Sequence, residues 1–171
     1  MMNLTWKIVK HTDLSIDDLH SIAVLKNQHW PYGIDSQIRW TKENVFDEDF
    51  HLMGMNEDYR LVAYITISRL SVVIDGVSNE VLGIGGVCID KEFEHHGYGK
   101  KMVNEANSFI QCQSLMGLLL CKENLVAFYK KCGWLDIEFE CALVAGNAFS
   151  HKIMAFPNMF MCKSIAIDRN F

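Results

Sequence analysis

The spacing of apolar residues changes along this chain between the period of a strand and the period of a helix. Residues 81–89 are almost wholly apolar, as expected for a buried strand, and a turn rich in glycine follows them. Residues 100–110 then carry an apolar stripe at helical spacing, formed by Met102, Val103, Ala106, Phe109 and Ile110. The pattern predicts a strand, a glycine turn and a helix in direct succession.

The rest of the chain extends this pattern. Strands are also predicted at 6–10, 51–55, 60–74, 116–121, 139–144 and 158–167, and helices at 15–28, 36–45 and 124–132. Ser15 and Asp18 have the spacing of a capping box, Asp75-Gly76 is a hairpin signal, and Gly133 is suited to a helix end. These elements predict an α/β fold: a mixed, mostly antiparallel sheet of about seven strands with helices on both faces.

Size and composition restrict the class of protein. At 171 residues the chain is expected to form a single domain over 1–171, and its 50% hydrophobic and 22% charged residues are ordinary for a soluble protein. No segment has the length of a membrane span, and the N-terminus lacks the order of a signal peptide. A cytoplasmic protein without membrane contact is expected.

Cysteine and histidine spacing gives no support for a metal site. Six cysteines are present, none in a Cys-x-x-Cys pair, and most lie in apolar runs where a reduced thiol behaves as a small hydrophobe. His95 and His96 are adjacent in sequence, so they do not share a helical face as paired ligands would. We therefore expect structural thiols and no metal.

A glycine turn between a strand and a helix can bind an anion through backbone amides. A dinucleotide fingerprint would need a third glycine where Met102 stands and an acid near residue 119, in an apolar run. A nucleotide-triphosphate loop would need Ser or Thr after Gly99-Lys100, where Lys101 stands, and a glycine in place of Glu94. Neither nucleotide motif is present.

The segment Glu94-His95-His96-Gly97-Tyr98-Gly99 resembles the main signature of the GNAT superfamily of acyl-CoA-dependent N-acyltransferases. That signature is Gln or Arg, two residues, Gly, one residue, then Gly or Ala, so Glu94 is a departure. The resemblance implies that the amides of this loop and of the following helix hold the pyrophosphate of coenzyme A. We expect the Glu94 carboxylate to face away from it, because like charges repel. His96 stands where Lys or Arg is common.

A second motif follows at the distance the family requires. Its pattern of Asn, two residues, Ala, an apolar residue, Tyr, three residues, Gly and an aromatic is matched by Asn124, Ala127, Phe128, Tyr129, Gly133 and Trp134. The resemblance also implies a bulge at 87–89 and a splayed cleft between the fourth and fifth strands for the pantetheine arm. The implied cofactor-binding residues are Val87, Cys88, Ile89, Glu94, His95, His96, Gly97, Tyr98, Gly99, Lys100, Asn124 and Tyr129.

By this resemblance the chain is an acetyl-CoA-dependent N-acetyltransferase that moves the acetyl group directly to a primary amine. The amide near residues 88–89 would polarise the thioester carbonyl, and Tyr129 would act as the catalytic acid at the coenzyme A sulfur. Many members carry a Glu on the fourth strand as general base, but Gly83, Ile84, Gly85 and Gly86 occupy those places here. We assign no base, and we expect the glycines to leave open space beside the thioester.

The acceptor is predicted from weaker signals. The net charge of −5 argues against a general nucleic-acid surface and is compatible with a cationic substrate. We predict a small cationic amine as acceptor, either aminoglycoside-like or polyamine-like. Trp30 and Tyr32 in a Pro/Gly loop, with Asp35, are candidate substrate residues. The chain is also distantly similar to aminoglycoside 2′-N-acetyltransferases, although the acidic pair before their last strand is absent. Three alternatives stay open: acetylation of a protein or peptide, a non-catalytic acyl-CoA sensor, and assembly as a homodimer.

Overall fold

The computed structural model describes residues 3–158 and 160–171. The chain divides into two compact units, the first built from residues up to 68, residues 85–106 and Phe171, and the second from residues 69–84 and 107–170. Two long strands, β3 (Leu61–Ile74) and β4 (Val77–Ile89), each contribute to both units. Their Asp75-Gly76 connection has positive φ at both residues, as the hairpin signal predicts.

The first unit begins with β1 (Thr5–Lys10), a 3₁₀ turn (His11–Asp13), α1 (Ile16–His29), α2 (Ile34–Asn44) and β2 (Phe50–Met55). β2 pairs antiparallel with β1 on one side and with the first half of β3 on the other. The Ser15 hydroxyl accepts a hydrogen bond from the Asp18 amide at 3.0 Å, which confirms the predicted cap of α1.

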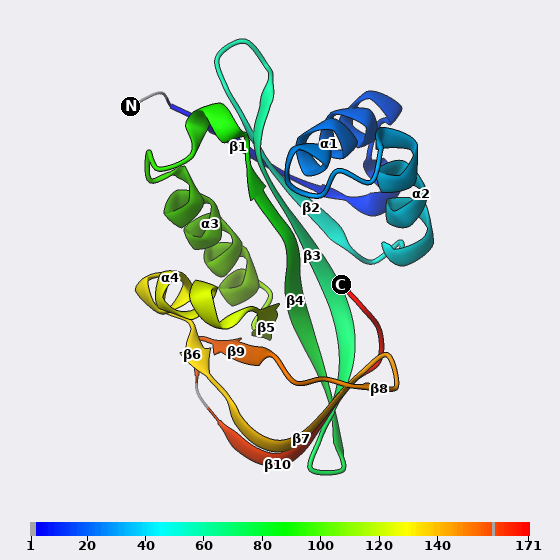
Figure 1. The fold of residues 1–171 in the computed structure, drawn as a ribbon, viewed down its shortest axis with the longest axis vertical. Coiled ribbons are helices and arrows are strands. Elements are labelled where there is room, and N and C mark those ends of the chain that lie inside the picture. Colours follow the sequence, from blue (N-terminus) through cyan, green and yellow to red (C-terminus); the bar gives the residue numbers. More distant parts are fainter. Residues whose placement is uncertain (1–2, 159) are drawn as a thin grey trace. The chain divides into compact units, whose positions relative to one another are not determined.

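The core of the first unit lies between α1 and the strands. α1 and α2 lie together on one side of β2 and β3, and the start of α3 (Tyr98–Cys112) lies on the other side (Figure 1). The buried cluster on the α1 side consists of Val9, Ile22, Leu25, Met53, Leu61, Tyr64 and Cys88. One face of α1 is thereby fixed against β1, β2, β3 and the end of β4.

The second unit continues the chain from β5 (Met116–Cys121) through a 3₁₀ turn (Glu123–Leu125), α4 (Val126–Lys131), β6 (Leu135–Asp136), β7 (Glu138–Val144), β8 (Asn147–Ala148), β9 (Lys152–Phe156) and β10 (Met161–Ile167). Its strands follow the order β6-β9-β5-β4-β3-β10-β7-β8. β4 pairs in parallel with β5, and β10 in parallel with β7, so the sheet is mixed as predicted.

The described residues form ten strands, whereas about seven were predicted. β6 and β8 have only two residues each, and β9 is a short apolar run without the alternation that marks a half-buried strand. The last predicted strand, 158–167, corresponds to the shorter β10, and its residue 159 lies outside the described residues. The helix predicted from 124 is only partly correct, because its first residues form a 3₁₀ turn.

Candidate active site

β4 bends close to its carboxyl end. Gly86 has a φ of 58°, in the left-handed region that favours glycine. The pairing of β4 with β5 runs only from Val81 with Met116 to Ile84 with Leu119, so the ladder ends before the bend. The irregularity expected at this strand therefore lies directly before Val87, a half-buried residue that is followed by the buried Cys88 and Ile89.

The open space expected beside the β4 glycines is absent at Gly85 and restricted at Gly86. A Cβ on Gly85 would lie 2.6 Å from the backbone carbonyl carbon of Phe171. A Cβ on Gly86 would lie 3.2 Å from the Thr66 hydroxyl oxygen and 4.0 Å from Cε of Lys26. A side chain at Gly85 would meet the Phe171 backbone, whereas Gly86 also lines a cavity.

Asp90, the first residue after β4, ties the loop to the rest of the first unit. Its carboxylate accepts hydrogen bonds from Arg60 Nη2 at 2.5 Å, from Gln28 Nε2 at 3.1 Å and from the Glu92 amide at 3.0 Å. Burial opposes ionisation of this carboxyl, but the hydrogen bonds outweigh that effect and lower its pKa. Gln28 Oε1 also accepts from the Lys91 amide at 3.0 Å, so α1 holds both residues at the start of the loop.

Glu94 and its neighbours connect the loop to the end of α1. The His29 Nε2 lies 2.6 Å from the Ile89 carbonyl oxygen, and its Nδ1 lies 3.9 Å from the Glu94 carboxylate. His96 Nδ1 lies 2.6 Å from the Glu94 carbonyl oxygen. The Glu94 carboxylate therefore has an imidazole as a close neighbour.

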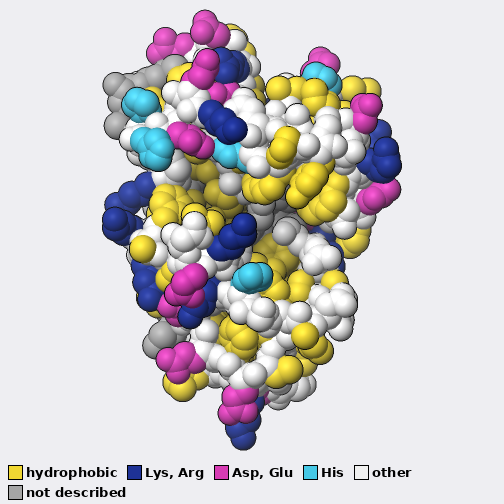
Figure 2. Space-filling model, in the orientation of Figure 1, with side chains coloured by type: hydrophobic (Ala, Val, Ile, Leu, Met, Phe, Trp, Pro, Cys, Tyr) yellow, Lys and Arg dark blue, Asp and Glu magenta, His cyan; other side chains and the backbone are white. Residues whose placement is uncertain are grey.

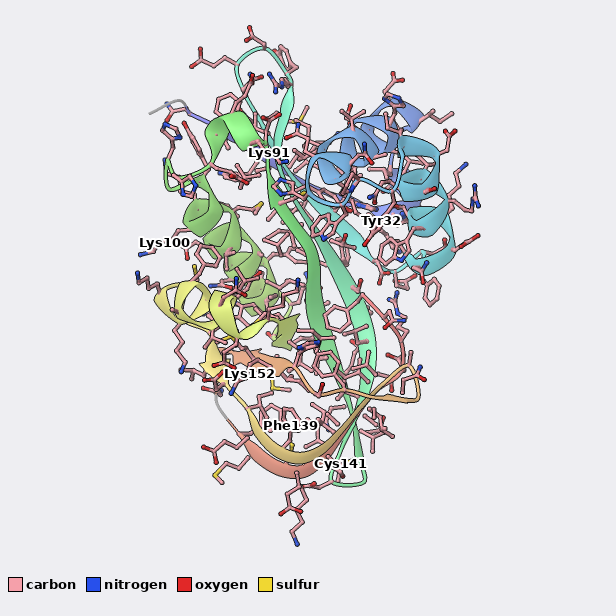
Figure 3. The ribbon with its side chains drawn as sticks, viewed as in Figure 1. Tyr32, Lys91, Lys100, Phe139, Cys141 and Lys152 are labelled. Carbon is pink, nitrogen blue, oxygen red and sulfur yellow. The ribbon has the colours of Figure 1, made fainter. Side chains whose placement is uncertain are left out.

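The loop enters α3 through two residues with positive φ, His95 at 63° and Gly97 at 81°. The Lys101 amide donates to the Gly97 carbonyl at 3.3 Å, which makes residues 98–100 the first turn of the helix. Amides in a first helical turn have no acceptor within the helix and carry the positive end of its dipole. No atom lies within 4 Å of a Cβ built on Gly97, and the exposed Lys100 extends away from α3 (Figure 3), so the loop surface is open to a ligand.

Tyr129 lies on α4 in the second unit, and Asn124 lies in the exposed 3₁₀ turn that precedes it. The Tyr129 side chain is buried, and burial raises the pKa of its hydroxyl above the ordinary value. This hydroxyl makes no hydrogen bond with any described residue. The protonated hydroxyl therefore has no hydrogen-bond acceptor in the described part of the chain.

A cavity of about 390 Å³ opens in the first unit between α1, α2 and the bend of β4. Its lining residues are Lys26, Trp30, Tyr32, Ser36, Gln37, Trp40, Gly86 and Phe171. Trp30 and Tyr32, both predicted as substrate residues, line it from the segment that joins α1 to α2. Figure 3 shows Tyr32 in this segment. Asp35, the third predicted substrate residue, is exposed on the first turn of α2 and is not part of the lining.

Lys26 is the one charged side chain in this lining, and the sequence analysis did not select it. It is 5% exposed, and its Nζ lies 4.3 Å from the centroid of the Trp40 ring. Burial lowers the pKa of the ammonium, an effect that the Cys88 thiol partly opposes. A signal was present in the sequence, because Lys26 follows Ile22 at the i, i+4 spacing that puts both on one helical face.

A chain of buried hydrogen bonds lies beneath the same region. His11 Nδ1 and His51 Nε2 are 2.9 Å apart, His51 Nδ1 and the Tyr64 hydroxyl 2.8 Å, and the Tyr64 and Thr66 hydroxyls 2.8 Å. Burial, with a smaller contribution from His11, lowers the pKa of His51 to about 4. His51 is therefore neutral at pH 7 and serves as one donor and one acceptor.

The six cysteines are free thiols, and no group of three metal-ligating side chains occurs among the described residues. On the face in Figure 2, basic and acidic side chains of the described residues are interspersed. No helix in the described part of the chain is both long enough and apolar enough to cross a membrane.

The chain has structural neighbours across almost its whole length. Escherichia coli ElaA is 20% identical, with a TM-score of 0.65 over 89% of this chain and 98% of that one. The E. coli GNAT protein YhbS, solved with CoA, is 12% identical, with a TM-score of 0.66 over 97% and 90%. A GNAT acetyltransferase from Brucella melitensis, solved with acetyl-CoA, is 15% identical, with a TM-score of 0.61 over 95% of each chain.

At these identities the neighbours establish the fold. A comparison with curated protein sequences gives no match. The model of the acetyltransferase (GNAT) family matches residues 16–134, which is well over half of the chain and includes both motifs and the helices that form the cavity. The chain belongs to the GNAT acetyltransferase family.

Proposed function

We propose that this protein binds acetyl-CoA at the loop between β4 and α3 and transfers the acetyl group directly to a primary amine of a small molecule. The observation that carries the proposal is the loop itself. It begins after the end of β4 at Ile89, passes through positive φ at His95 and Gly97, and ends at the first turn of α3. A pyrophosphate needs such a set of backbone donors at the positive end of a helix dipole. Residues 94–100 would supply them.

In the proposed reaction the acceptor nitrogen attacks the thioester carbonyl carbon in its neutral form. The carbon–nitrogen bond forms, the carbonyl oxygen takes negative charge, and a backbone amide near Cys88 and Ile89 would stabilise that charge. The carbon–sulfur bond then breaks, and the coenzyme A thiolate takes the hydroxyl proton of Tyr129. The acceptor nitrogen releases its surplus proton to solvent water, and the Tyr129 oxygen regains a proton from solvent. Burial of Tyr129 supports this role, because a raised pKa keeps the donor protonated at neutral pH.

No general base is assigned. Asp90 cannot take this role freely, since its carboxylate is already held by Arg60 and Gln28 and its pKa is lowered. Glu80 lies earlier on β4 than the glycines, and its carboxylate pairs with Arg69. Asp90 is better described as a positioning residue for the loop.

The cavity supports a small acceptor. Its volume of about 390 Å³ and its aromatic lining are typical of small-molecule sites. Asp35, the one acidic residue among the predicted substrate residues, does not line this cavity, so the cavity gives the predicted cationic acceptor no support. A small acceptor is favoured over a folded protein because the volume and the aromatic lining of this open pocket suit a small molecule.

The test combines calorimetric titration of acetyl-CoA with release of the free thiol in the presence of a panel of amines. Binding followed by thiol release with a small amine is the expected result. Binding with no release for any amine, including peptides, would favour the acyl-CoA sensor. No binding of acetyl-CoA would overturn the proposal as a whole.

A further inference from the structure

Lys26 points to the kind of acceptor that the cavity takes. Its side chain is 5% exposed and reaches into the cavity, yet it makes no hydrogen bond and no ion pair with any described residue. Its one polar contact is the Trp40 ring beneath the Nζ at 4.3 Å. An ammonium in this position lacks a counter-ion from the part of the chain that the structure describes.

The titratable groups near Lys26 do not supply that counter-ion. Burial raises the pKa of Cys88 to about 12, so the side chain on the neighbouring strand stays a neutral thiol. His51 on β2 is neutral at pH 7 and acquires positive charge in acid. Tyr64 on β3 also stays protonated, because burial raises its pKa. No anion therefore faces Lys26 from these three strands.

The energy of this arrangement favours an anionic ligand. Burial of an uncompensated ammonium costs more free energy than a cation–π contact with one aromatic ring returns. A carboxylate entering the cavity would supply the missing charge and accept hydrogen bonds from Nζ. Such a ligand gains affinity because the protein has left the site unpaired.

The remaining lining describes the body of that ligand. Trp30, Tyr32 and Trp40 provide aromatic surface, and Ser36 and Gln37 provide polar groups. The Gln37 Nε2 donates to the Trp30 carbonyl oxygen at 2.7 Å, which leaves its amide oxygen as the available group. A Cβ built on Gly86 would lie 4.0 Å from Cε of Lys26. Gly86 directly precedes the end of β4, whose amide is proposed to polarise the thioester. A carboxylate paired with Lys26 would thus lie near the thioester carbon that the amine attacks. An acceptor that carries its amine and its carboxylate on one carbon meets this requirement.

We infer that the acceptor is an amine with a carboxylate, on an apolar or aromatic body, whose carboxylate pairs with Lys26; aromatic α-amino acids represent this class. The inference rests on the proposed function and narrows its acceptor from any small amine to an acidic one. Lys26 is then a specificity-determining residue.

A binding experiment tests the pairing without turnover. Indole-3-acetate is titrated into the acetyl-CoA-saturated protein, into Lys26→Met, and into Lys26→Arg. The loss of a charged hydrogen-bonding partner is expected to weaken binding by roughly 10- to 100-fold in Lys26→Met, while Lys26→Arg stays within a few-fold of the parent. Lys42→Met, a change of the same type at an exposed position on α2, is the control. Equal affinity in the parent and in Lys26→Met would overturn the inference.

A kinetic experiment separates this inference from the proposed function. Thiol release is compared for tryptophan and tryptamine, for phenylalanine and phenethylamine, and for spermidine. The inference expects lower KM for the amine with a carboxylate in each pair, and a raised KM for that amine alone in Lys26→Met. Preference for tryptamine or spermidine would overturn it and leave acetyl transfer standing. Equal loss of kcat in Lys26→Arg and Lys26→Met with tryptamine would also overturn it, and would indicate a role in proton transfer.

Discussion

The Nδ1 of His51 on β2 lies 2.8 Å from the hydroxyl oxygen of Tyr64 on β3, and both side chains are fully buried. The pair continues through Tyr64 to Thr66, whose hydroxyl adjoins Gly86 at the bend of β4. A neutral imidazole therefore supports the strand that carries the proposed acetyl site. This relationship makes the first unit sensitive to acid.

Acid is expected to destabilise the protein through His51. Its pKa is about 4 in the folded state and near 6.5 in the unfolded chain, so the unfolded chain binds the extra proton between these values. Stability from this group is full above pH 6.5 and falls by about 3 kcal/mol as pH drops through 4. Urea unfolding of the parent and of His51→Gln at pH 7.0, 5.5 and 4.5 measures it. The variant is expected to lose less stability on acidification, and His20→Gln, an exposed histidine, should behave like the parent.

Replacement of Lys26 by Met is expected to stabilise the protein by roughly 1 to 3 kcal/mol, because an unpaired buried ammonium is exchanged for an apolar chain of similar length. The folded-state pKa of Lys26 is lowered, so the parent gains stability as pH rises toward 10.5. The difference in the free energy of unfolding between Lys26→Met and the parent should therefore become smaller as pH rises from the lowered folded-state pKa of Lys26 to 10.5. A destabilised Lys26→Met at pH 7 would show that Lys26 has an anionic partner within the folded chain.

Substitution of Gly97 is expected to weaken acetyl-CoA binding. Gly97 has a φ of 81° and open space around its Cβ position, so Gly97→Ala brings backbone strain of about 1 kcal/mol without a clash. Strain at the loop should reduce acetyl-CoA affinity by roughly 10-fold, because the amides no longer converge. Gly146→Ala is a matched control, with a φ of 76° and the same open space in the β7–β8 turn. Calorimetry should show unchanged acetyl-CoA affinity for Gly146→Ala. Equal affinity in Gly97→Ala and Gly146→Ala would contradict the proposed binding of acetyl-CoA by the loop.

Removal of the Tyr129 hydroxyl tests the proposed acid. Tyr129→Phe is expected to lower kcat by roughly 10- to 100-fold, with little change in acetyl-CoA affinity, since the thiolate must then take its proton from water. Stopped-flow or steady-state thiol release measures the effect. Tyr59→Phe, at an exposed turn, should retain the parent rate. An unchanged kcat in Tyr129→Phe would remove the residue from the mechanism.

The side-chain amide of Asn107 joins two buried groups of the second unit. Asn107 Nδ2 donates to the Cys132 carbonyl at 2.8 Å, and its Oδ1 accepts from the fully buried Trp134 indole at 2.9 Å. Asn107→Ala leaves both groups without this partner and is expected to cost roughly 2 to 4 kcal/mol. Glu105→Ala, on the exposed side of α3, should change stability by less than about 0.5 kcal/mol. Thermal and urea unfolding compare the two.

The local elements that form the loop could be predicted from the sequence. The strand before Gly86, the turn through Gly97 and the apolar stripe from Met102 are each encoded within a few residues. The cap at Ser15 and the helix end at Gly133 were likewise predicted, because a cap or a positive φ is a property of one short segment. The short strand β9 was not, since its five residues carry no alternation.

By itself, then, the sequence determined the family motifs, the order of the main elements and the glycine loop that we propose binds acetyl-CoA. Only the tertiary structure decided that Lys26 enters the cavity beside Gly86, that Asp35 does not line it, and that Phe171 fills the space at Gly85. Periodicity identifies the buried face of a helix, but the partner of that face comes from packing between segments far apart in the chain. Whether a buried charge meets an anion therefore depends on which residues that packing brings together.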